Sequence, residues 1–417
     1  MLTLCSVVFS VNITDKMNIP QDHHFFSNNL RDESIKRRKL SAFTDAFFKP
    51  WDLNSITTTK DNVVEDFEYF HKRKFVGINL ETIYHDYYDK LRIEADLHSF
   101  PNMYSNGIST RQTDIRIIPS DLPAYIVDSK HNSYPFDRIQ ESSLPANTPL
   151  KIIHRSKNNS WCFVQMPFLS GWVRSADIAF LSTKQTKDYN RHQTFIAITD
   201  IDIPTYFMND QYKSQTGLGS VYPLIDQTDE HFIVQTFDHN IDGTIEPISI
   251  KIDKASAKPM PLELNPINIE LIFNKLQHTP YSWGGKQQLT DCSEMIKKAL
   301  TPFGFVLPRN SSDQFKHSGV NENIKHIEDK KTYINRNSKP YQTLIYMPGH
   351  IMLYIGQYNN EPVVFHNVWS LSTGHPNGHR ISIGQALNSS LEPGKEQYVN
   401  DTYTGLLSSV VGLTHLE

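Results

Sequence analysis

The sequence predicts a multidomain α+β protein with a helical N-terminal segment, two small β-barrels and a C-terminal α+β domain. The chain has 417 residues, more than one hydrophobic core usually serves. Short apolar runs between polar turns fill its middle, whereas a helical stripe and an apolar hairpin mark its last part. We expect a leader or disordered segment at 1–30, the helical segment at 31–108, barrels at 109–185 and 190–256, and the C-terminal domain at 262–417.

The N-terminal segment combines an ambiguous leader with a helical pattern. Residues 1–11 resemble the apolar part of a secretory signal, but no Lys or Arg precedes them and no clear small-residue cleavage site follows. A functional leader would make the protein periplasmic or secreted, and otherwise it would be cytoplasmic. Further on, Phe43 and Phe47 have helical spacing, and Pro50 closes the helix.

The middle of the chain reads as two sets of short strands. In the first, apolar runs at 150–154 and 161–166 are separated by a turn-forming polar run at 156–160. In the second, runs at 195–198, 219–224, 231–235 and 248–252 indicate four more strands. Each set has the size of a small barrel, so we interpret the two as a loose duplication of one barrel type.

Composition and cysteine usage exclude several classes of protein. A net charge of −4 argues against a nucleic-acid-binding protein, which normally carries a patch of basic residues. No apolar run approaches the roughly 20 residues that span a bilayer. The three cysteines lie far apart, which excludes a disulfide scaffold and disfavours a cysteine-based zinc site. Cys162 lies in an apolar run and is expected to be a buried structural thiol. We see no sign of a cofactor or a metal, and the oligomeric state stays open.

Cys292 stands at the predicted start of a helix. An apolar stripe follows it at helical spacing, formed by Met295, Ile296, Ala299, Leu300 and Phe303. Asp291 is a natural N-cap, and the positive end of the helix dipole favours thiolate over thiol. A merely buried cysteine at a helix start is the alternative interpretation.

Two histidines lie on an apolar hairpin downstream of this cysteine. His350 and His366 are each eight residues from Tyr358, at the centre of an Asn-rich turn, so we expect them to face each other on antiparallel strands. One ring would take the thiol proton while the other orients it, as in a catalytic triad. A zinc site that includes His375 and His379 is a weaker alternative, because these lie in a turn without a helix to align them.

These residues belong to a set of motifs that resembles the NlpC/p60 cell-wall peptidases, a papain-like cysteine peptidase family. The upstream motifs resemble the subgroup with an N-terminal stabilising segment and two bacterial SH3-like domains. The catalytic motifs are Tyr-Ser-Trp-Gly-Gly at 281–285, Asp-Cys-Ser at 291–293, Leu-Pro-Arg-Asn-Ser at 307–311 and the run at 349–356. The upstream ones lie at 48–51, 114–119 and 135–140.

The resemblance implies hydrolysis of the bond between γ-D-glutamate and a diamino acid, usually meso-diaminopimelate, in peptidoglycan stem peptides. It implies a catalytic triad and an oxyanion-binding tyrosine, and in members acting on free peptides a site for the ammonium of an N-terminal L-alanine. The matching residues are Cys292, His350 and His366 for the triad, Tyr281 for the oxyanion, and Asp291 and Ser293 for the ammonium. Trp283 would either form part of the wall of the site or only pack beside it.

Four residues near these motifs carry further expectations. Glu294 stands where the family usually has glycine, so it would crowd the cleft or select a cationic group. Arg309 fits a structural salt bridge better than a substrate carboxylate. In related enzymes the first barrel closes one end of the cleft, and Asp137 and Glu141 are candidates for that role here.

Other functions remain open at this level. A papain-like amidase or acyltransferase would use the same Cys–His–His set, because fold and triad do not fix the substrate. A non-catalytic wall-binding protein would tolerate loss of the triad, and here all three positions are filled. A transglutaminase-type enzyme would need Asp as the third residue. The sequence does not distinguish wall remodelling, recycling and attack on another organism.

Overall fold

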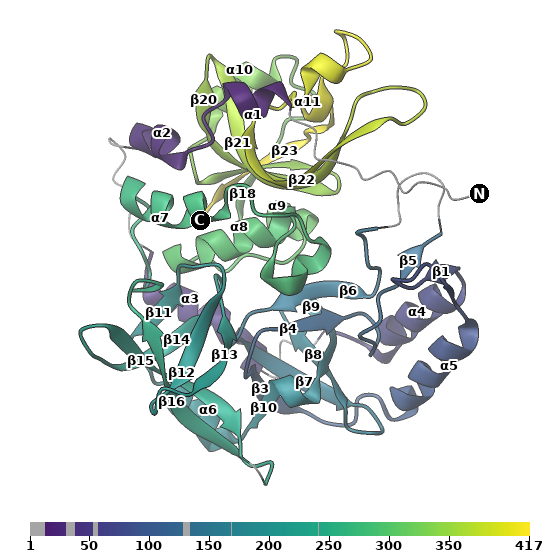
Figure 1. Ribbon diagram of the computed structural model, residues 1–417, viewed down its shortest axis with the longest axis vertical. Helices are drawn as coiled ribbons and strands as arrows, with labels where there is room; N and C mark the ends of the chain where they lie inside the picture. Colours follow the sequence, from purple (N-terminus) through teal and green to yellow (C-terminus); the bar gives the residue numbers. More distant parts are fainter. Residues whose placement is uncertain (1–12, 31–37, 53–56, 128–133, 168, 241) are drawn as a thin grey trace.

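The computed structural model describes residues 13–30, 38–52, 57–127, 134–167, 169–240 and 242–417. The predicted fold class is confirmed: a helical N-terminal part, β-sheet barrels and a C-terminal α+β domain follow one another along the chain. In Figure 1 the C-terminal domain lies above the two barrels, and α4 and α5 flank the first barrel on its outer side.

Residues 13–30 differ from the expected leader or disordered segment. They form α1 (Thr14–Asn18), α2 (His23–Ser27) and η1 (Asn28–Leu30), which pack on the C-terminal domain. The physical reason is burial: Ile13, His23 and Phe26 are fully buried, and the His23 ring bonds to Tyr341 Oη at 2.9 Å. We call residues 13–30 the N-terminal strap.

The remaining N-terminal helices attach to the barrels. Phe43 and Trp51 pack between the two barrels, and the Trp51 indole donates to the Gly107 carbonyl at 2.9 Å. Thr59 and Asn62 form a capping box at the start of the next helix. The elements are α3 (Leu40–Phe47), η2 (Lys49–Trp51), α4 (Lys60–His71), α5 (His85–Glu94), η4 (Leu97–Ser99) and the small sheet β2–β1–β5 (Thr82–Ile83, Phe75–Val76, Tyr125–Ile126).

The first barrel is a seven-stranded sheet with the order β10–β3–β7–β8–β9–β4–β6. The predicted hairpin is present as β7 paired with β8, and Cys162 on β8 is fully buried, as expected. Its strands are β3 (Ser105–Ser109), β4 (Thr113–Arg116), β6 (Gln140–Leu144), β7 (Pro149–Arg155), β8 (Trp161–Met166), β9 (Leu169–Arg174) and β10 (Ile178–Leu181), with η5 (Ser175–Asp177) between the last two.

The second barrel has the order β13–β12–β16–β15–β14–β11–β17, and α6 (Thr183–Tyr189) leads into it. All four predicted strands are present, as β11 (Phe195–Ile198), β14 (Val221–Gln227), β15 (His231–His239) and β16 (Ile245–Asp253). Three were not predicted: β12 (Ile203–Phe207), β13 (Tyr212–Thr216) and the short β17 (Ala257–Pro259). Strand β13 is rich in polar residues, and β12 is only five residues long and contains Pro204, so neither gives a clear strand pattern in the sequence.

The C-terminal domain packs α7 and α8 against an antiparallel sheet with the order β18–β23–β19–β20–β21–β22. The predicted stripe on α8 is buried against this sheet, and Gly304 ends the segment with a φ of +89°. The helices are α7 (Pro266–Leu276), η6 (Trp283–Gln288), α8 (Cys292–Leu300), η7 (Thr301–Phe303), α9 (Ser311–His317), α10 (Lys330–Asn337), η8 (Lys395–Gln397) and α11 (Gly405–Ser409). The strands are β18 (Gly319–Asn323), β19 (Thr343–Met347), β20 (His350–Tyr358), β21 (Glu361–Ser372), β22 (Arg380–Ser389) and β23 (Gly412–Leu416).

The hairpin β20–β21 forms as predicted, but its register differs. Asn359 and Asn360 both have positive φ and make a two-residue turn, so Tyr358 pairs with Glu361 instead of standing at the centre. A bulge between Tyr354 and Gly356 shifts the pairing again. The two predicted histidines therefore lie diagonally on one face rather than directly opposite each other.

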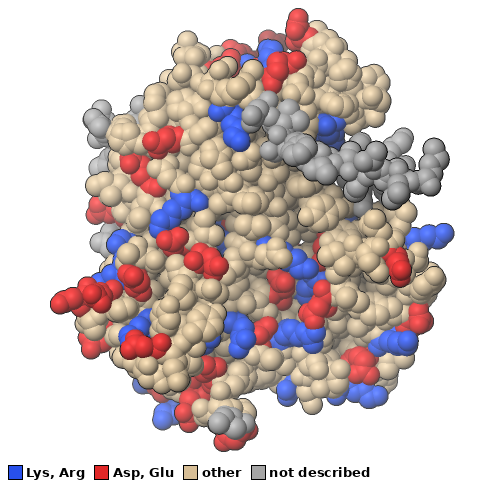
Figure 2. Space-filling model, in the orientation of Figure 1, with Lys and Arg blue, Asp and Glu red and all other residues tan. Residues whose placement is uncertain are grey.

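Charged residues are mixed in sign on the face that Figure 2 shows. Lys and Arg alternate with Asp and Glu over the barrels, while most of the visible C-terminal domain is uncharged. Within the ranges that the structure describes, no helix is long and apolar enough to cross a membrane.

Candidate active site

A cavity of about 620 Å³ lies between the C-terminal domain and the first barrel. Six of the seven predicted site residues line it: Tyr281, Trp283, Asp291, Cys292, Ser293 and His350. The seventh, His366, is fully buried behind His350. The structure thus brings together residues on or just before η6, α8, β20 and β21, which are up to 85 positions apart in the sequence.

Cys292 is the first residue of α8, and its side chain is nearly buried at 9% exposure. The backbone N–H groups of Ile351 and Ser293 donate to its sulfur. Burial, followed by the negative charge of Asp291, raises the pKa of the Cys292 thiol to about 12. Loss of solvation thus opposes the thiolate that the helix dipole was expected to favour.

Behind the cysteine runs a chain of hydrogen bonds with a defined direction. The Ser389 hydroxyl donates to the Ser390 carbonyl at 2.7 Å, so it can only accept at its contact of 3.0 Å with His366 Nε2. His366 therefore carries its proton on Nε2, and its Nδ1 accepts from His350 Nε2 at 2.9 Å. With Nε2 of His350 protonated, Nδ1 of the same ring is left as a free base.

Both imidazoles are neutral at rest. Burial lowers the pKa of His350 to about 4, although the nearby Asp291 opposes the shift. Burial also lowers the pKa of His366 well below its usual value, and the adjacent His350 adds to this. A neutral imidazole with a free Nδ1 can accept a proton from a thiol in the same cavity.

Asp291 does not present a free carboxylate to the cavity. It accepts two hydrogen bonds from the Arg309 guanidinium, at 2.6 Å and 3.2 Å, and caps α8 through the Glu294 N–H at 3.0 Å. Burial alone would raise the pKa of Asp291, but the charge and hydrogen bonds of Arg309 hold it below its usual value. Arg309 thus makes the structural salt bridge that its residue type suggested, and it also donates to Ser293 Oγ at 2.9 Å.

Glu294 points away from the cavity. Its side chain is 1% exposed and is bound by Arg309 Nε at 3.1 Å, by Lys298 Nζ at 3.2 Å and by the Ser143 hydroxyl of the first barrel. It neither crowds the cleft nor offers a charge to a ligand there. It instead joins α8 to the first barrel.

The first barrel supplies one wall of the cavity through Phe136, Gln140 and Glu141. The Phe136 ring meets the Trp283 ring edge-on at 5.2 Å. Burial raises the pKa of Glu141, while Arg309 and a hydrogen bond from Asn310 oppose the shift. Asp137, the other acid considered from the sequence, is instead buried in ion pairs with Arg116 at 2.8 Å and Lys286 at 3.1 Å.

Three residues of the site were not found from the sequence. Trp369 lies 6.0 Å from the Tyr281 ring, and Arg380 lines the cavity with its guanidinium on Ser370 Oγ at 2.9 Å. Ser389 is the third. None belongs to a motif, and the strand β22 that carries two of them gives only an ordinary strand pattern.

The alternative zinc site lacks a set of ligands among the described residues. His375 and His379 lie 5.9 Å apart in an exposed turn, and His366 is engaged with His350 and Ser389. Within the described ranges, no three His, Cys, Asp or Glu side chains are grouped as a metal would require.

Comparison with known proteins matches three parts of the chain to family models. Residues 278–401, which hold every predicted site residue, match the NlpC/P60 family. Residues 5–100 match the N-terminal stabilising domain of NlpC/P60 proteins. The chain belongs to the NlpC/P60 family. Members are typically cysteine peptidases that hydrolyse cell-wall peptidoglycan. Residues 127–174, within the first barrel of this NlpC/P60 protein, match the SH3 domain of the SH3b1 type.

Two solved structures share its fold. An NlpC/P60 endopeptidase from Photobacterium damselae subsp. piscicida superposes with a TM-score of 0.86 at 20% identity and covers 98% of both chains. An NlpC/P60 family protein from Bacillus cereus ATCC 10987 gives a TM-score of 0.51 at 13% identity, over 75% of this chain and 99% of that one. No curated protein matches the sequence.

Proposed function

We propose that this NlpC/P60 protein cleaves the bond between γ-D-glutamate and a diamino acid, meso-diaminopimelate, in free peptidoglycan stem peptides. Cys292 is the nucleophile, His350 the base and His366 the residue that orients the base. The observation that carries the proposal is the directed chain from Ser389 through His366 to His350, which leaves a free base on a ring that lines the same cavity as Cys292.

The reaction follows from the protonation states. As the Cys292 sulfur attacks the amide carbon, its proton passes to His350 Nδ1, and the resulting imidazolium donates to His366 Nδ1. The oxyanion is held by the Cys292 N–H, which has no intrahelical acceptor, and by the Tyr281 hydroxyl. Burial and the nearby Asp291 raise the pKa of Tyr281, so its proton stays available for donation. His350 then protonates the leaving amine, and water hydrolyses the thioester.

The barrel wall favours short peptides with a free N-terminal L-alanine. An intact glycan strand would need an open end of the cleft where Phe136 and Glu141 stand. Because Arg309 neutralises Asp291, the carboxylate left to pair with the alanine ammonium is Glu141. Asp291 and Ser293 then shape this end of the site through Arg309, in place of the direct contact that the family motif implies.

Arg380 is suited to a carboxylate of the diamino acid. It lines the cavity, and its Nε and Nη2 donate to Ser370, whereas its Nη1 makes no hydrogen bond within the described residues. The only other guanidinium on the cavity wall, among those residues, is Arg309, which is already paired with Asp291.

The test is incubation of L-Ala-γ-D-Glu-meso-diaminopimelate with the protein, followed by mass spectrometry. We expect release of L-Ala-γ-D-Glu by the parent protein and by Cys162→Ala, which removes a buried cysteine remote from the cavity, but not by Cys292→Ala. Acetylation of the alanine amine should slow cleavage strongly. Turnover by Cys292→Ala would disprove the mechanism. No cleavage by any sample would point to an amidase or acyltransferase with another substrate.

A further inference from the structure

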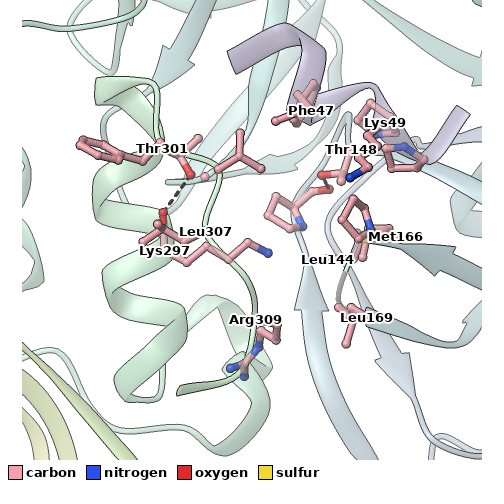
Figure 3. Close-up of a pocket in the computed structure, with 18 of the residues that line it drawn as sticks. Phe47, Lys49, Leu144, Thr148, Met166, Leu169, Lys297, Thr301, Leu307 and Arg309 are labelled. Carbon is pink, nitrogen blue, oxygen red and sulfur yellow. Dashed lines mark hydrogen bonds between the residues drawn. The ribbon is translucent and has the colours of Figure 1, made fainter. Parts of the chain in front are cut away.

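A second cavity, of about 180 Å³, lies where three parts of the molecule meet. Figure 3 shows it between α8 with the loop that follows, strands of the first barrel, and the helix α3. Its walls are mostly apolar side chains, among them Phe47, Leu144, Met166, Leu169 and Leu307. It is separate from the catalytic cavity, although Arg309 forms part of the wall of both.

The charges on this wall are all of one sign. Lys49, Lys297 and Arg309 line the cavity, and none of the described residues that line it is acidic. The Arg309 guanidinium is occupied by Asp291 and Glu294, and Lys49 is exposed at the rim. The cation that faces the interior is therefore Lys297.

Lys297 has no ionic partner among the described residues. Its side chain extends from α8 toward the barrel residues in Figure 3, while its backbone carbonyl accepts from the Thr301 hydroxyl at 2.8 Å. The nearest acid on the same helix, Glu294, is already bound by Arg309 and Lys298. Burial lowers the pKa of Lys297 to about 8, as expected for an ammonium without a counter-ion.

We propose that this cavity binds a small carboxylate with an apolar body, its carboxylate paired with the Lys297 ammonium and its hydrocarbon part against the apolar wall. A half-buried, unpaired cation gains from an anion that brings a hydrogen-bond acceptor with it. The lining excludes a polar body, and the absence of acids excludes a cationic head.

The volume limits the size of the ligand. An apolar cavity of about 150 Å³ is known to hold benzene, so this one suits an acid of about eight or nine non-hydrogen atoms, such as hexanoate or benzoate. Such a ligand would touch the stabilising helix, the barrel and the catalytic helix at once. Its binding does not depend on the peptidase reaction.

The test compares hexanoate with its neutral analogue hexanamide, by saturation-transfer NMR on the full-length protein. We expect hexanoate to bind with a dissociation constant of about 1 mM and hexanamide about tenfold more weakly. In Lys297→Met the two should bind equally, and Lys297→Arg should restore the preference for the acid. Ala46→Phe, which fills the cavity from α3, should bind neither.

A matched control keeps the result specific. Lys316→Met removes an exposed lysine that does not line the cavity, and it should keep the tenfold preference. A melting temperature within a few degrees of the parent value would show that each variant is folded. The proposal is overturned if the preference persists in Lys297→Met, if Ala46→Phe binds as the parent does, or if the parent shows no saturable binding of hexanoate.

Discussion

Ser389 sets the direction of the proton chain, because its own hydroxyl proton is committed to the Ser390 carbonyl. Ser389→Ala would leave His366 Nε2 without its acceptor and free the ring to adopt the other tautomer. We expect kcat to fall about 3- to 10-fold, which corresponds to the free energy of one hydrogen bond, and we expect KM to stay unchanged. Steady-state kinetics on the tripeptide would measure both. Ser372→Ala, on the same strand as His366 but outside the chain of hydrogen bonds, should leave kcat unaltered; an equal loss there would refute this role.

The pH dependence of alkylation would show whether Cys292 rests as a neutral thiol. With a thiol pKa near 12, the thiolate fraction rises about tenfold for each pH unit up to that value. Iodoacetamide should therefore modify Cys292 at a rate that climbs steadily from pH 6 to pH 9. Mass spectrometry of a variant whose other two cysteines are alanine would follow this residue alone. A rate already constant at pH 6 would instead indicate a thiolate–imidazolium pair.

The proposed preference for a free amine rests on Glu141. Glu141→Gln keeps the size of the side chain and its bond with Asn310, but removes the charge. We expect KM for the free tripeptide to rise about 10-fold or more, the worth of a charge-assisted hydrogen bond. The N-acetylated tripeptide should be cleaved equally by parent and variant. An unchanged KM for the free peptide would show that another group receives the ammonium.

At the scale of elements, the turn η6 contains two glycines, and a side chain at either position would collide with neighbouring atoms. A Cβ on Gly285 would lie 2.3 Å from Glu294 Oε2, and the residue has a φ of +70°. Gly285→Ala should therefore lower the free energy of unfolding by more than the roughly 1–2 kcal/mol of the backbone conformation alone. Thermal unfolding would test this against Gly243→Ala, which has a φ of +82° but nothing within 4 Å. Equal losses in the two variants would rule out the steric contact with Glu294.

Elements with a strong local pattern could be predicted from the sequence, whereas contacts between distant residues could not. The stripe on α8 and the apolar runs of the hairpin follow from spacing alone. The register of the β20–β21 hairpin could not be predicted, because the bulge after Tyr354 and the turn at Asn359 and Asn360 depend on backbone geometry. The bonds of Arg309 to Asp291 and of Ser389 to His366 join residues 18 and 23 positions apart, and no local pattern encodes them.

On the scale of the whole molecule, the N-terminal strap contacts the two residues that flank Ser389. Gln21 exchanges two hydrogen bonds with the backbone of Asn388, at 2.9 Å and 3.1 Å, and Asp15 accepts from the Ser390 N–H at 2.8 Å. These contacts hold both neighbours of Ser389, the residue that orients His366. The strap lies outside the catalytic cavity, so it acts on the chemistry through position alone.

This arrangement predicts that a change in the strap alters kcat and leaves KM as it was. Gln21→Ala removes both bonds to Asn388, which should loosen Ser389 and lower kcat about 3- to 10-fold. The Nε2 proton of His366 should also exchange faster with solvent, which imidazole ¹⁵N NMR would detect. Gln193→Ala, at an exposed site before the second barrel, is the control and should change neither quantity. A rise in KM without a loss of kcat would mean that the strap shapes the substrate site instead of the proton chain.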